Sequence, residues 1–142
     1  MRLRNALSGL PDYFATTEET DGFISAPSVM HYPIGGGYMQ EHADPVSKQK
    51  CVISAVMSKR GKDFTTGGLY LKDFDGRKID VEALTEVGDV LVFNPSCRHG
   101  VEAIDPGPRL LWDDPRGRWM MFSTLVPLAS LNGGAVAGLE TY

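Results

Sequence analysis

Glycine and proline divide this chain into segments that are too short for long helices. The 142 residues include 16 glycines and nine prolines. The segments between these turn signals are rich in Val, Ile, Phe, Tyr and Met, which favour strands. Eight segments are therefore expected to be strands: residues 28–33, 38–43, 51–58, 68–72, 77–81, 89–94, 99–104 and 117–126.

The order of these segments predicts a mainly β fold. No pattern typical of a helix lies between the expected strands, so a double-sheet jelly roll or barrel fits better than alternating strands and helices. We expect one domain over residues 1–142. It comprises an N-terminal extension (1–25), a core (26–127) and a tail (128–142). In the extension, Leu3, Leu7 and Leu10 predict one short helix, with irregular chain after it.

Composition argues against several classes of protein. A formal charge of −4 gives no electrostatic reason to expect nucleic acid as a partner. Cys51 and Cys97 are too few for a disulfide framework, and no Cys-x-x-Cys pair suggests structural zinc. Because no apolar run is long enough for a signal peptide or a membrane span, we expect a cytoplasmic protein with no membrane partner.

Two of the three histidines are placed as metal ligands would be. His42 and Asp44 flank Ala43, so on an extended chain both side chains point to the same side. His99 opens a later apolar segment, which can lie beside the second strand of a jelly roll. Two imidazoles and one carboxylate leave open positions on a metal and suit Fe(II). A solvated loop explains His42 and Asp44 equally well, and a hydrogen bond to the backbone explains His99.

Several motifs accompany these residues over positions 28–126. They are His-Tyr-Pro-Ile-Gly at 31–35, His-Ala-Asp at 42–44, Thr-Gly-Gly-Leu-Tyr-Leu at 66–71, Gly-Asp-Val-Leu-Val-Phe at 88–93 and Arg-His-Gly-Val-Glu-Ala-Ile at 98–104. With these motifs in this order, the chain resembles the double-stranded β-helix superfamily of Fe(II)/2-oxoglutarate-dependent dioxygenases. The resemblance implies a cupin-like jelly roll in which His42, Asp44 and His99 bind Fe(II).

The resemblance also implies contacts with the co-substrate 2-oxoglutarate. In that superfamily an arginine on the final strand holds the distal carboxylate, and a guanidinium matches a carboxylate in bidentate fashion. We favour Arg118, which opens the last apolar segment, over Arg109, which we expect before a lengthened loop at 110–116. By the same resemblance, the Tyr32 hydroxyl donates a hydrogen bond to 2-oxoglutarate.

The expected activity is hydroxylation of an unactivated C–H bond, with 2-oxoglutarate and O2 consumed and succinate and CO2 released. The resemblance also argues against halogenation as the activity, because halogenating relatives lack the carboxylate found here at Asp44. No catalytic residue beyond the metal ligands is expected. A small-molecule substrate is the first choice and a peptide or protein side chain the second, with contacts from the segment before His42 and from residues 45–50.

Two alternatives remain open from the sequence. One is a cupin-like metal enzyme that does not use 2-oxoglutarate, and the other is a jelly-roll binding module without catalysis. Relatives of the dioxygenase class carry a longer N-terminal region over one sheet. Because residues 1–25 are a short extension, we expect a second copy or another chain to cover that side.

Overall fold

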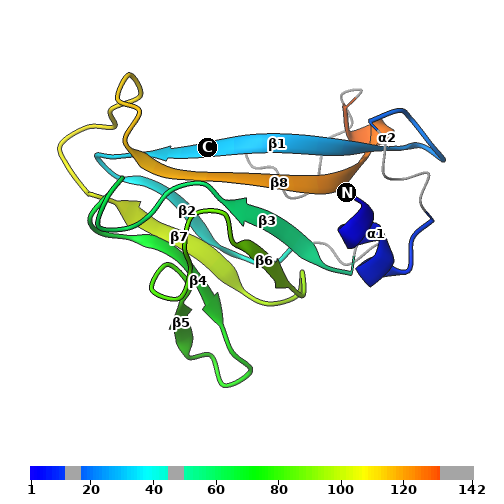
Figure 1. The fold of residues 1–142 in the computed structure, drawn as a ribbon, viewed down its shortest axis with the longest axis horizontal. Coiled ribbons are helices and arrows are strands. Elements are labelled where there is room, and N and C mark those ends of the chain that lie inside the picture. The colour runs from blue at the N-terminus through cyan, green and yellow to red at the C-terminus, as the bar shows by residue number, and fades with distance from the viewer. Residues whose placement is uncertain (12–16, 45–49, 132–142) are drawn as a thin grey trace.

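Two four-stranded antiparallel sheets lie face to face in the computed structural model, which describes residues 1–11, 17–44 and 50–131 (Figure 1). The first sheet has the order β1 (Phe23–Pro33), β8 (Gly117–Pro127), β3 (Val52–Val56) and β6 (Val90–Phe93). The second has the order β2 (Gly37–His42), β7 (His99–Ile104), β4 (Gly68–Lys72) and β5 (Lys78–Asp80). Strands that are distant in sequence are thus neighbours in both sheets.

The mainly β prediction is confirmed, since each of the eight expected segments overlaps one strand. The largest difference is at β1, which begins at Phe23 rather than at residue 28 and pairs with β8 along its whole length, from Phe23 opposite Pro127 to Pro33 opposite Gly117. Residues 23–25, the last three of the expected extension, are therefore part of the first sheet.

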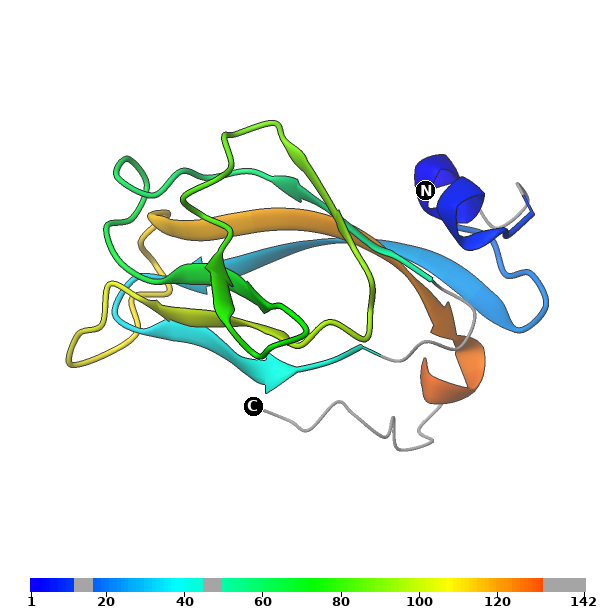
Figure 2. The ribbon, with the colours of Figure 1, turned by 90° about the horizontal axis from the view of Figure 1, so that it is seen from below.

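The two helices, α1 (Arg2–Ser8) and α2 (Leu128–Leu131), lie at one end of the molecule, opposite the loop between β7 and β8 (Figure 2). The predicted N-terminal helix is present, but its polar face is the buried one. Leu3 and Leu7 are 51% and 52% exposed, whereas Arg4 and Asn5 are fully buried. Neither helix in the described part of the chain has the length or apolar content to cross a membrane.

The apolar core lies between the sheets, as alternation along paired strands requires. Its buried members are Tyr32, Ile34, Phe64, Leu69, Val81, Val101 and Ile104. By contrast, the outer face of the β1-β8-β3-β6 sheet leaves apolar side chains half exposed, among them Val29, Met121 and Val90. Cross-strand pairing places Met121 opposite Val29 on β1. A partner chain over this face remains a prediction.

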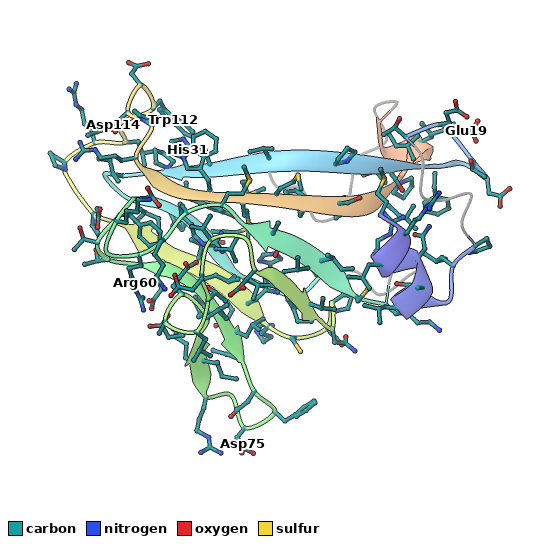
Figure 3. All side chains as sticks on the ribbon, viewed as in Figure 1. Glu19, His31, Arg60, Asp75, Trp112 and Asp114 are labelled. Carbon is teal, nitrogen blue, oxygen red and sulfur yellow. The ribbon has the colours of Figure 1, made fainter. Side chains whose placement is uncertain are left out.

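Residues 105–116 connect β7 to β8 and are pinned at both ends. Asp105 accepts hydrogen bonds from the backbone N–H groups of Thr65 and Thr66, at 2.9 and 2.6 Å. At the other end, the His31 ring stacks on Trp119 with centroids 3.9 Å apart, and Trp112 meets His31 edge-on (Figure 3). The lengthened loop expected before the last strand is therefore present, and β8 begins beyond it.

Candidate metal centre

The two site histidines face each other across a pair of antiparallel strands. His42 ends β2 and His99 begins β7, and the two residues are direct partners in the register of these strands. Directly opposed residues project to the same side of a sheet. Their rings accordingly lie with centroids 4.3 Å apart, on the side that faces the other sheet.

Asp44 completes the group from just beyond the end of β2. Its backbone N–H donates to the carbonyl of Pro95 at 2.9 Å, which fixes the chain beside the turn that precedes β7. The carboxylate lies 3.6 Å from Nε2 of His42 and 3.7 Å from Nε2 of His99. One ligand atom from each of the three residues can be chosen so that all lie within 4.8 Å of one another.

This arrangement fits a single metal ion. Ligand atoms about 2.1 Å from an ion lie about 3 Å apart at adjacent octahedral positions. Small side-chain movements would bring the Asp44 carboxylate and the two Nε2 atoms, now 3.6 and 3.7 Å apart, to that separation. The structure therefore brings together the three residues that the sequence assigns to the metal, in a geometry compatible with iron.

Backbone carbonyl groups set the orientation of both rings. Nδ1 of His42 lies 2.9 Å from the carbonyl oxygen of Gln40, and Nδ1 of His99 lies 2.9 Å from that of Cys97. Because a carbonyl oxygen only accepts, each Nδ1 donates its proton when the ring is neutral. The lone pair then lies on Nε2, the atom that faces Asp44 in both rings. Such outer hydrogen bonds orient the imidazole ligands of metals.

The protonation behaviour of the two histidines differs because their surroundings differ. Burial lowers the pKa of His99, whose side chain is only 6% exposed and which packs against Phe93. A neutral imidazole is the form that binds metals. The nearby Asp44 carboxylate favours the charged imidazolium and so raises the pKa of His42, which is a third exposed. The site is thus closed on the His99 side and open to solvent beside His42 and Asp44.

An apolar cavity of about 140 Å³ extends from the three residues into the space between the sheets. Its walls come from both sheets and include Met39, Leu69, Met120, Phe122 and Tyr32. The cavity adjoins a charged group through Met120, because Nη1 of Arg118 lies 3.1 Å from the Met120 sulfur. A ligand held by the three residues would therefore enter a mostly apolar space, with the Arg118 guanidinium behind Met120.

The two residues assigned to 2-oxoglutarate lie side by side in the first sheet. Tyr32 on β1 is the register partner of Arg118 on β8, and the guanidinium carbon lies 5.7 Å from the centre of the tyrosine ring. The Tyr32 hydroxyl donates to the Met39 sulfur at 3.5 Å. Arg109, the competing choice, is exposed on the loop between β7 and β8.

Sequence reasoning missed the ion pair that Arg118 makes. Nε of Arg118 donates to the carboxylate of Glu82, and both side chains are almost fully buried. Nothing in the sequence around Glu82 marks it, since it lies in the connection between β5 and β6 and belongs to no motif. The expected substrate contacts at 45–49 lie outside the described residues.

Searches of protein-family models, curated proteins and solved structures found no match to this chain. Function must therefore be inferred from the residues of the site and their geometry.

Proposed function

We propose that this protein binds one Fe(II) through Nε2 of His42, Nε2 of His99 and the carboxylate of Asp44, and that it is a 2-oxoglutarate-dependent oxygenase. In the overall reaction, one oxygen atom of O2 enters a C–H bond of the substrate. The other enters succinate as 2-oxoglutarate loses CO2. A small molecule is the proposed substrate, with a peptide or protein side chain as the second choice.

The convergence of the three donor groups is the observation that carries this proposal. Each imidazole has its Nδ1 engaged by a backbone carbonyl and its Nε2 directed at the same carboxylate. Two histidines and one carboxylate on one side of an ion leave other positions open, as non-haem Fe(II) oxygenases require. When bound there, Fe(II) would supply the oxygen chemistry, while the chain supplies orientation and an apolar cavity.

Unused hydrogen-bonding capacity at Arg118 supports an anionic co-substrate. The side chain is 2% exposed, yet among the described residues its guanidinium donates only to Glu82 and to the sulfur of Met120. A guanidinium carries five N–H donors, and a thioether is a weak acceptor. A carboxylate in the cavity could take the place of that sulfur and accept from the Nη edge of the guanidinium.

The arrangement of the strands also supports the proposal. Eight antiparallel strands in two sheets, ordered β1-β8-β3-β6 and β2-β7-β4-β5, are what we expect of a double-stranded β-helix, a form of jelly roll. In this order His42 at the end of β2 and His99 at the start of β7 face the space between the sheets, and Arg118 lies near the start of β8, an inner strand of the first sheet.

One observation favours a second candidate function. Arg118 already has a carboxylate partner in Glu82, so its charge is balanced without any ligand. A cupin-like Fe(II) enzyme that uses no 2-oxoglutarate would need only His42, Asp44 and His99.

Anaerobic titration separates these functions. Fe(II) is added to the protein first, and 2-oxoglutarate is then added while the weak visible charge-transfer band of the metal-bound 2-oxo acid is followed. We expect a band in the wild type, and an Arg118→Lys variant that binds 2-oxoglutarate about tenfold to 100-fold more weakly because it loses the planar fork but keeps the charge. Fe(II) affinity should be the same in both proteins.

Each other outcome identifies an alternative. Iron binding without a band would support the cupin-like enzyme. Failure to bind iron would overturn the metal site and leave the non-catalytic binding module.

A further inference from the structure

Glu82 and Arg118 form a buried ion pair beside the cavity. Their exposed fractions are 4% and 2%, and Glu82 Oε1 accepts from Nε of Arg118 and also from the backbone N–H of Leu69, at 3.0 Å for the latter. Two donors on one oxygen hold the carboxylate in a single position. The pair therefore has a fixed geometry, which a simple surface ion pair lacks.

A glycine at residue 68 leaves the space that the Glu82 side chain occupies. Gly68 has φ of +124°, and a Cβ atom on it would overlap Cγ of Glu82. Glycine is thus required at residue 68 both for its backbone conformation and for the space that Glu82 occupies. The second glycine of the Gly67-Gly68 pair is explained by the acid it accommodates.

The pairing decides which edge of Arg118 is left for a ligand. Glu82 takes the Nε edge, and Nη1 then reaches the sulfur of Met120, a residue that lines the cavity. A guanidinium is planar, so fixing one edge fixes the direction of the other N–H groups. Among the described residues, the other contacts of the guanidinium are with the Met120 sulfur and the Tyr32 ring, and neither is an ion pair.

We infer that Glu82 is a positioning residue, which orients Arg118 so that its Nη edge can receive the distal carboxylate of a 2-oxo diacid. This inference rests on the proposed function. Met120 occupies the place of that carboxylate when no ligand is bound and moves aside when one enters. Methionine suits this role because its side chain is flexible and its sulfur binds donors weakly.

Two conservative variants separate positioning from mere balancing of charge. Glu82→Asp keeps the negative charge but draws the carboxylate back by one methylene, whereas Glu82→Gln keeps an acceptor oxygen in place but removes the charge. The Fe(II)-loaded proteins are titrated anaerobically with 2-oxoglutarate. They are also titrated with pyruvate, a 2-oxo acid that has no second carboxylate.

Positioning predicts that Glu82→Asp raises the Kd for 2-oxoglutarate about tenfold or more, since a misdirected guanidinium loses a charge-assisted hydrogen bond. Glu82→Gln should stay within about threefold of the wild type. The Kd for pyruvate and the Kd for Fe(II) should be unchanged in both variants, because neither ligand reaches Arg118. A general loss of structure would raise all three constants together.

The opposite pattern would overturn the inference. If Glu82 only balances charge, Glu82→Gln should tighten 2-oxoglutarate binding and Glu82→Asp should leave it unchanged. If the wild type shows the band and the two variants have the same Kd for 2-oxoglutarate, the positioning role of Glu82 is overturned, but the proposed function is not. A wild-type protein that shows no band with 2-oxoglutarate would overturn the proposed function, and this inference with it.

Discussion

His99 is the residue on which the proposed metal site most depends. Its ring is buried, its Nδ1 is held by the carbonyl of Cys97 and its Nε2 faces Asp44. We expect His99→Ala to weaken Fe(II) binding at least about 100-fold, because loss of even an outer hydrogen bond to a ligand costs 10-fold to 100-fold. Isothermal titration of the anaerobic protein with Fe(II) measures this change.

His31 provides the matched control for that measurement. It is the third histidine of the chain, but its ring stacks on Trp119 and lies near the carbonyl of Arg116 at 3.1 Å. A His31→Ala variant should bind Fe(II) as tightly as the wild type. If both alanine variants weakened binding equally, the effect would be one of general stability and the assignment of His99 would be wrong.

At this scale the sequence predicted that His42, Asp44 and His99 come together, but it did not predict the residues around them. Alternation along a strand places His42 and Asp44 on one side, and this local rule needs no tertiary information. Glu82 could not be found in this way. Its role depends on the approach of a connection between β5 and β6 to the start of β8, and no short-range pattern encodes that approach.

The N-terminal helix shows where reasoning at the scale of elements fails. Spacing of leucines predicted α1 correctly as a helix, but its buried contacts are polar: Arg4 donates to the hydroxyl of Ser25 at 2.9 Å, and Ser8 meets Cys51 at 3.5 Å. A helix of seven residues at the end of a sheet can bury only one narrow face. Which face it buries is set by the strand residues beside it, which the helix sequence does not reveal.

Gly68, at the start of β4, gives a prediction for this element. Gly68→Ala should lower the free energy of unfolding by about 3 kcal/mol or more, because it combines an unfavourable backbone conformation with overlap against Glu82. The measurement is urea denaturation at equilibrium. The same variant should weaken 2-oxoglutarate binding, since Glu82 must shift away from Arg118.

Gly76 supplies the comparison, because its φ is also positive but an added Cβ would make no contact. Its φ is +77°, and a Cβ atom there would meet nothing within 4 Å. Gly76→Ala should lower the free energy of unfolding by only about 1–2 kcal/mol, which is the effect of a left-handed backbone conformation alone. Equal losses in the two variants would mean that Glu82 moves freely and is not held in place.

For the whole molecule, the sequence determined the number of strands but not their partners. Turn signals between short apolar segments mark eight strands wherever they later pair. The first sheet, however, joins β1 to β8 from opposite ends of the chain, and many pairings of eight strands satisfy the same local signals. Spacing alone therefore predicted the class of fold, and the resemblance was needed to expect His99 beside His42.

Metal binding at the proposed site should also stabilise the whole fold. His42 and Asp44 come from the end of β2 and His99 from the start of β7, so one ion would tie two strands and the turn before β7 together. A ligand that binds only the folded state stabilises it by mass action. At free Fe(II) about 100 times the Kd, the gain is about 2.7 kcal/mol. We expect the Tm of the anaerobic protein to rise by several degrees with Fe(II), as scanning calorimetry can measure. The rise should disappear in His99→Ala and persist in His31→Ala. An equal rise in His99→Ala would show that Fe(II) acts elsewhere on the chain, and the proposed centre would then have to be abandoned.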